Sequence, residues 1–78
     1  MKHYLTTNEE RKLFKAISVN LARQYMNKGV AFGDLIDAGM EGLRQATMKY
    51  NPESGTMFLI YGAWEIQKAM KQAIKKKK

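Results

Sequence analysis

The residues of this chain best suited to chemistry lie between Met57 and Lys78. If this segment is one α-helix, spacings of three and four place aromatic and basic residues on one face: Tyr61, Trp64, Lys68, Lys71 and Lys75. Exposed aromatic rings stack on unpaired bases and ammonium groups bind phosphates, a combination typical of single-stranded nucleic-acid binding. The opposite face is apolar, with Leu59, Ala63, Ile66, Met70 and Ile74. The segment therefore predicts a helix that packs through one face and binds through the other.

The sequence offers no set of residues for catalysis or for a cofactor. It contains no cysteine, which excludes a disulfide framework and a thiolate metal site. Its single histidine, His3, has no catalytic or ligand partner near it in the sequence. Asp34 and Asp37 lie one helical turn apart, but two carboxylates without a further ligand are more typical of a solvated face than of a metal site. We therefore expect a protein that is not an enzyme, with no metal and no cofactor.

Length and charge indicate one small basic domain. It spans residues 1–78, of which 1–7 and 75–78 are expected to be disordered. The net charge of +7 is uneven: residues 1–30 carry six basic and two acidic groups, residues 31–48 one and three, and residues 49–78 seven and two. The basic parts favour a polyanion as partner, and the acidic part favours a basic protein surface. Because no apolar stretch predicts a signal peptide or a membrane span, we expect a cytoplasmic protein.

Hydrophobic periodicity predicts the first helix from Asn8 to Asn27. Thr7 and Glu10 have the spacing of a capping box at its start. A stripe of apolar residues is expected to face the core: Leu13, Ile17, Leu21 and Tyr25, with Phe14 beside them. Lys28-Gly29 then closes the helix, because glycine readily adopts a positive φ.

The second helix is predicted from Gly33 to Tyr50. Its buried side is expected to comprise Leu35, Ile36, Gly39, Leu43, Ala46 and Tyr50. Glycine in a helix interior costs roughly 1 kcal/mol relative to alanine, so Gly39 and Gly42 indicate close packing of helices. The outer side carries three acids and an arginine at spacings of three and four: Asp34, Asp37, Glu41 and Arg44. The acids, which we name the acidic ridge, could meet a basic partner, although the helix dipole alone also favours the first two.

The segment from Asn51 to Gly55 predicts a turn before the last helix. Pro52 cannot continue the preceding helix, and Gly55 suits a left-handed conformation. The third helix is expected to begin near Thr56. Three amphipathic helices can close around one core, so the predicted fold class is all-α, a small three-helix bundle.

The ordered motifs of the chain resemble region 2 of the sigma-70 family, the bacterial initiation factors that direct RNA polymerase to promoters. The resemblance extends without gaps over about residues 17–74. Any one motif is weak alone, but the ordered set is specific. It consists of Leu21-Ala22-Arg23-Gln24-Tyr25, Asp34-Leu35-Ile36-Asp37-Ala38-Gly39, Gly42-Leu43, Lys49-Tyr50, Gly55, Phe58, Tyr61, Ala63-Trp64, Ile66 and Ala69.

The resemblance implies, first, that the second helix docks on the clamp helices of the largest subunit of the RNA polymerase core. The acidic ridge thereby gains an expected basic partner. Ala38 and Met40 stand where family members usually have polar contacts, which bears on the strength of docking and not on its location. The residues assigned to this polymerase-binding surface are Asp34, Asp37, Met40, Glu41, Leu43 and Arg44.

The resemblance implies, second, that the third helix recognises and helps melt the promoter minus-ten element through its unpaired strand. Tyr61 stands where a ring stacks on a flipped base, and Trp64 where an indole props open the end of the duplex. Primary members carry further aromatic and basic residues where this chain has Glu53-Ser54, Thr56, Glu65 and Gln67, and Glu65 would add a like charge near phosphates. We therefore expect weaker melting or a different promoter sequence. The assigned DNA-binding residues are Lys49, Phe58, Tyr61, Trp64, Lys68, Lys71 and Lys75.

Other interpretations stay open at this point. As a sigma module, the chain is either one half of a split factor, working with a separate region 4-bearing subunit, or an excised domain. A different class of function is a generic basic helical module that binds single-stranded nucleic acid without polymerase. A lysine-rich amphipathic helix also suits a membrane surface or a partner groove, although we expect no membrane partner. Finally, aromatic residues at helical spacing are often half-buried at a core edge, which would give Tyr61 and Trp64 a packing role.

Overall fold

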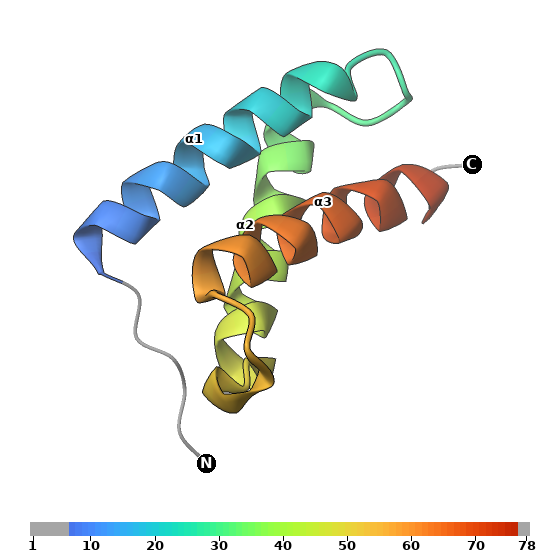
Figure 1. The fold of residues 1–78 in the computed structure, drawn as a ribbon. Coiled ribbons are helices and arrows are strands. Elements are labelled where there is room, and N and C mark those ends of the chain that lie inside the picture. Colours follow the sequence, from blue (N-terminus) through green and yellow to red (C-terminus); the bar gives the residue numbers. More distant parts are fainter. Residues whose placement is uncertain (1–6, 77–78) are drawn as a thin grey trace.

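The computed structural model describes residues 7–76 and has an all-α fold (Figure 1). Along the chain lie α1 (Asn8–Gln24), α2 (Phe32–Lys49), one turn of 3-10 helix, η1 (Pro52–Ser54), and α3 (Phe58–Lys76). Residues 7–76 contain no strand, so the predicted fold class is confirmed. The expectations for His3 and for the first six and last two residues lie outside the described residues. No helix in the described range is both long enough and apolar enough to cross a membrane.

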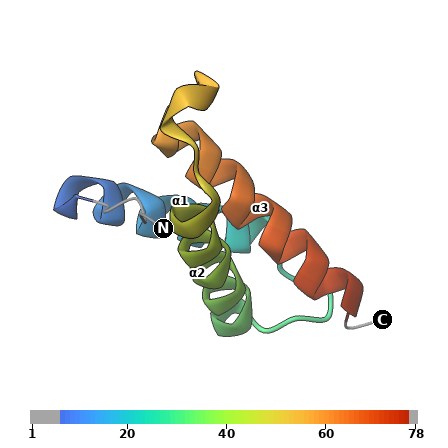
Figure 2. The same ribbon diagram turned by 90° about the horizontal axis from the view of Figure 1, so that it is seen from below.

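The three helices pack around one core, with α2 and α3 forming the most extensive contact. α2 crosses the direction of α1 and α3 in Figure 1. The connection between α1 and α2 lies beside the C-terminal half of α3 (Figure 2), where residues 25, 27 and 28 share a hollow with Lys71 and Ile74. The largest fully buried apolar side chains come from all three helices: Phe14, Leu35, Ile66 and Met70.

α1 begins at the predicted capping box and ends earlier than predicted. The Thr7 amide donates to Glu10 Oε1 at 3.0 Å, and the Glu10 amide donates to Thr7 Oγ1 at 3.0 Å, which confirms the box. The helix stops at Gln24, three residues before Asn27: Tyr25 is its C-cap, and Asn27 has a left-handed backbone with φ +68°. Gly29 follows with φ +92°, the positive value expected for it.

The predicted core stripe of α1 is displaced around the helix. Leu13 is 50% exposed, and Ile17, Leu21 and Tyr25 are only half-buried; the fully buried residues are Phe14, Ser18 and Ala22. Small side chains at the last two positions let the α1 backbone approach its neighbours. The Ser18 hydroxyl is satisfied by donating to the Phe14 carbonyl at 2.9 Å, and it lies 3.5 Å from Met40 Sδ on α2.

Two glycines of α2 permit its close contact with α3, as predicted. A Cβ built at Gly39 would lie 2.7 Å from Met70 Cε, the end of a flexible side chain. A Cβ at Gly42 would lie 2.7 Å from Ala69 Cβ and 2.8 Å from the Glu65 carbonyl oxygen. Since a backbone atom cannot move aside, position 42 admits only glycine at this helix separation.

The predicted turn between α2 and α3 is confirmed. Asn51 Oδ1 accepts a hydrogen bond from the Glu53 amide at 3.0 Å, and Gly55 has φ +88°. The Tyr50 hydroxyl donates to the Thr56 carbonyl at 2.6 Å, which ties the end of α2 to the segment before α3. α3 begins at Phe58, two residues after Thr56, and continues through Lys75 and Lys76.

Candidate functional site

The outer face of α3 presents a tryptophan followed by a row of lysines. Trp64 is 55% exposed, and Lys68, Lys71 and Lys75 are exposed at the following helical spacings. We name these four residues the lysine face. They line an open hollow of about 390 Å³ together with Gln67 and Gln72. The two glutamines were not singled out from the sequence, although their spacing from Trp64 and Lys68 places them on the same side of the helix.

Lys68 lies against the ring of Trp64. Its ammonium nitrogen is 5.1 Å from the centroid of the indole, within the range of a cation–π interaction. The four-residue spacing of the pair allows this contact, so the sequence contained a signal for it. Lys71 and Lys75 have no ion-pair partner within residues 7–76, which leaves their charges available to an anion.

Tyr61 has a more enclosed position than the lysine face. It is half-buried, and its ring lies 5.6 Å from the Tyr50 ring at a tilt of 41°. Burial raises the pKa of Tyr61 above its ordinary value, and the charge of Glu65 and a hydrogen bond to the Glu65 side chain raise it further. The phenol therefore stays protonated at neutral pH, and the residue remains partly exposed.

Three predicted contact residues do not join these surfaces. Phe58 is 4% exposed and makes edge-to-face contacts with Phe14 and Tyr50, at centroid distances of 5.6 and 5.0 Å. Leu43 is 7% exposed and belongs to the core beneath the outer side of α2. Lys49 is exposed and lines a second hollow, between α2 and α3, which shares Lys68 with the first. Phe58 and Leu43 thus support the two surfaces from inside.

Glu65, which the resemblance implies would add a like charge near phosphates, does not belong to the exposed face of α3. The residue is 7% exposed and lies on the side of α3 that packs against α2. Its carboxylate is 4.0 Å from the Lys68 ammonium nitrogen. Glu65 is thus buried together with Ile66 and Met70. The buried side of α3 is therefore wider than its apolar residues alone indicated.

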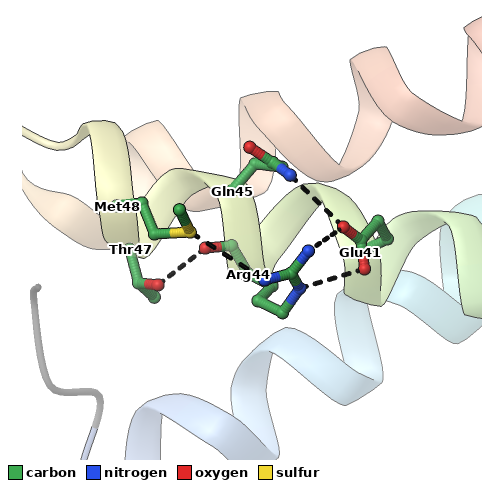
Figure 3. A network of polar contacts seen from close by, with 5 residues as sticks. All are labelled: Glu41, Arg44, Gln45, Thr47 and Met48. Atoms are coloured by element: carbon green, nitrogen blue, oxygen red, sulfur yellow. Dashed lines mark hydrogen bonds and ion pairs between the residues drawn. The ribbon is translucent and has the colours of Figure 1, made fainter.

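The outer side of α2 carries a chain of polar contacts along the helix (Figure 3). Arg44 binds Glu41 through two hydrogen bonds, Nη2 to Oε2 at 2.5 Å and Nε to Oε1 at 3.1 Å, and Gln45 donates to Glu41 Oε2 at 3.3 Å. The bond from Arg44, and then that from Gln45, lowers the pKa of Glu41, and the same Arg44–Glu41 bond raises the pKa of Arg44. Arg44 Nη1 also approaches Met48 Sδ at 3.9 Å.

The remaining acids of the ridge have no such partner. Asp34 and Asp37 are exposed, and no ion pair to either is found in the described part of the chain. Met40, 36% exposed, lies between them and Glu41 along the helix. Among residues 7–76, no group of three His, Cys, Asp or Glu side chains is placed to hold a metal ion. The outer side of α2 is therefore suited to binding another macromolecule through two uncommitted carboxylates and an apolar side chain.

Sequence comparison identifies what this arrangement is similar to. Residues 14–78 match the family described as Sigma-70 region 2. RNA polymerase sigma factor SigA of Nostoc sp. strain PCC 7120 is 43% identical over 56 residues, which cover 72% of this chain and 14% of the relative. RpoS of Coxiella burnetii is also 43% identical over 56 residues, covering 72% of this chain and 16% of the relative. The chloroplastic sigma factor sigF of Arabidopsis thaliana is 38% identical over 56 residues, covering 72% and 10%.

The chain spans between 10% and 16% of the length of these relatives. The family match nevertheless extends from Phe14 to the last residue and includes all of α2 and α3, the helices that carry the two exposed surfaces. The chain therefore belongs to the sigma-70 region 2 family.

Proposed function

We propose that this chain acts in transcription initiation as a region 2 module with two binding surfaces. The outer side of α2 binds the clamp helices of the largest RNA polymerase subunit, and the lysine face binds the unpaired strand of the promoter minus-ten element. The observation that carries the proposal is the shared hollow in which an exposed Trp64 precedes Lys68, Lys71 and Lys75. Membership in the family and the names of the relatives, RNA polymerase sigma factors, support it.

The lysine face suits an unpaired strand for physical reasons. Stacking of a base on an aromatic ring is worth about 1 to 3 kcal/mol, which offsets the cost of removing the base from a duplex. Trp64 offers such a ring in the open, and Tyr61 offers part of a second one behind it. The lysines that follow match the phosphates of the same strand and add salt-dependent affinity. Duplex DNA, whose bases are already stacked, would use the charges and not the ring.

The outer side of α2 suits a basic protein surface. Asp34 and Asp37 carry charges that no group in residues 7–76 neutralises, whereas Glu41 is already bound by Arg44. Charge complementarity of this kind speeds association and fixes orientation more than it adds affinity. Met40 and the stem of Arg44 would supply apolar contact. We therefore assign the electrostatic part of polymerase binding to Asp34 and Asp37, and treat Leu43 as core support beneath them.

The docking surface is tested by retention on purified core polymerase. We expect the variant Asp34→Lys with Asp37→Lys to lose retention, because two attractive charges become repulsive. The matched control is Glu9→Lys with Glu53→Lys, which changes the net charge equally at exposed positions outside the ridge. Retention of the first variant at the wild-type level, or equal loss by both, would refute docking through the ridge.

A generic nucleic-acid module remains the competing function, because three exposed lysines also favour binding without sequence preference. The two functions differ in the response to sequence. A minus-ten module is expected to bind its unpaired oligonucleotide more tightly than a scrambled one of equal length at 150 mM salt. Equal affinities, together with no retention on polymerase, would favour the generic module.

A further inference from the structure

Glu65 holds a carboxylate in an unusual place for a nucleic-acid-binding helix. Its side chain is 9% exposed, at the edge of a hollow of about 260 Å³ between α2 and α3. The hollow is also lined by Glu41, Lys49 and Lys68, so the buried carboxylate lies among charged residues and not in a purely apolar core. Burying a charge costs free energy unless it is paired, so a side chain kept here is expected to bind something.

Three candidate DNA contacts, Tyr61, Trp64 and Lys68, lie near Glu65 or near a residue that contacts it. Tyr61 lies four residues before it, and the Glu65 side chain is close enough to help raise the pKa of the Tyr61 phenol. Lys68, three residues after it, places its ammonium 4.0 Å from the carboxylate. The same ammonium lies 5.1 Å from the centre of the Trp64 ring. Glu65 thus lies between Tyr61 and Lys68, and Lys68 in turn lies over the Trp64 ring.

We propose that Glu65 is a positioning residue that holds Tyr61 and Lys68 in place and, through Lys68, the ring of Trp64. The proposal rests on the assignment of this face to the unpaired DNA strand. A free lysine side chain samples many rotamers, so holding Lys68 in advance lowers the entropy lost on binding. With the ammonium over one face of the indole, the other face is left for a base. At 4.0 Å the ion pair is weak enough for a phosphate to compete for the ammonium.

Glu65 differs from the exposed acids of the chain because it is buried and lies near a lysine. Glu53 lies in the turn, exposed, with no ion pair to its side chain in the described residues. Glu65→Gln and Glu53→Gln both remove one negative charge, so both should strengthen non-specific attraction to DNA equally. Any loss of affinity in Glu65→Gln alone must therefore come from the arrangement of its neighbours and not from net charge.

The first measurement uses NMR and needs no DNA. In the wild type, the side-chain methylene protons of Lys68 next to its ammonium are expected to be shifted upfield by the indole ring, relative to those of Lys71. Glu65→Gln should reduce this shift and lower the pKa of Tyr61, while Glu53→Gln should change neither. If Glu65→Gln does not fold, Glu65→Asp keeps the charge, withdraws the carboxylate by one methylene and should release Lys68 in the same way. A folded variant with wild-type Lys68 and Tyr61 signals would overturn the proposal.

The second measurement is affinity for the unpaired minus-ten oligonucleotide. We expect Glu65→Gln to bind about five-fold more weakly, the loss of roughly one positioning contact, and Glu53→Gln to bind as tightly as the wild type or slightly more so. Lys68→Gln should also weaken binding more than Lys71→Gln, because both lose one charge but only Lys68 is held against the ring. Equal losses within each pair would contradict positioning by Glu65. If the wild type does not bind DNA, the proposed function fails, and the NMR result still decides the role of Glu65.

Discussion

The outer sides of α2 and α3 differ in whether their charged side chains have partners within the protein. On α2, Arg44 and Gln45 both donate to Glu41, so the charge of Glu41 is paired within the helix. On α3, Lys71 and Lys75 have no ion-pair partner in residues 7–76, and only Lys68 contacts an acid. Like charges at helical spacing repel one another, which destabilises a helix slightly. The proposed function assigns the unpaired lysines of α3 to phosphates and the two unpaired aspartates of α2 to a basic protein surface.

The largest expected effect comes from a substitution at the contact between α2 and α3, which we name the seam and which is formed by Gly42, Glu65 and Ala69. Disrupting this contact should impair both binding surfaces together. Gly42→Val places atoms against the Glu65 carbonyl and Ala69, and overpacking of this kind costs about 1 to 3 kcal/mol. A small domain has little stability to lose, so a clear drop in thermal midpoint is expected by circular dichroism. Gly33→Ala is the control, since no atom lies within 4 Å of its added Cβ. A wild-type midpoint in Gly42→Val would show that the seam is less tight than its geometry indicates.

The next largest effect should fall on one surface alone. Trp64→Ala removes the exposed ring, and loss of one stacked base is worth about 1 to 3 kcal/mol, so affinity for the unpaired minus-ten strand should fall roughly 5- to 150-fold. Retention on polymerase and the thermal midpoint should change little, because the side chain is 55% exposed. Leu13→Ala, which truncates a half-exposed apolar residue of α1, serves as control. Unchanged DNA affinity in Trp64→Ala would remove stacking from the proposal.

A smaller effect should distinguish the contribution of the lysine charges to DNA binding from that of the Trp64 ring. Lys71→Gln and Lys75→Gln should each lower the slope of log affinity against log salt for single strands by about 0.7, the value for one phosphate contact. Lys12→Gln on α1 changes the net charge equally at an exposed position outside this face and should leave the slope unaltered. The slopes follow from fluorescence anisotropy titrations at several salt concentrations. Identical slopes in all three variants would mean that the lysines act only through net charge.

The smallest expected effect is a pH dependence at Tyr61. Burial, followed by the charge and hydrogen bond of Glu65, raises its pKa in the folded state above the ordinary value of about 10. The stabilising contribution is therefore complete below about pH 10 and is lost as the pH rises through the raised pKa. Because lysines titrate in the same range, the difference between wild type and Tyr61→Phe should be measured by denaturation from pH 8 to 12. A difference that does not vary with pH would contradict the raised pKa.

Much of the fold followed from local rules that the sequence displays directly. The capping box at Thr7 and Glu10, the turn at Gly55 and the close approach at Gly39 and Gly42 each depend on residues near one another or on a missing side chain. The core side of α1 did not follow from hydrophobicity, because Ser18 and Ala22 are buried for their small size while Leu13 remains half-exposed. Packing against a neighbouring helix selects volume as well as polarity.

The candidate site was predicted in outline and corrected in detail. The spacing that placed Trp64 with Lys68, Lys71 and Lys75 holds in the structure, since all four line one hollow. Phe58 and Leu43 turned out to be core residues, because an apolar side chain beside a binding surface has the same helical spacing as one within it. The resemblance implied that Glu65 adds a like charge near phosphates; in the structure its side chain is buried, with the Lys68 ammonium 4.0 Å from its carboxylate.

The missing side chain at Gly42 has a further consequence for the geometry of the molecule. A Cβ at this position would meet the Glu65 carbonyl and Ala69, so the α2 backbone lies directly against α3 there. The separation and relative direction of Asp34 and Trp64 are thereby set by the polypeptide itself. Two macromolecules bound at these two positions would therefore be held at a fixed distance from each other.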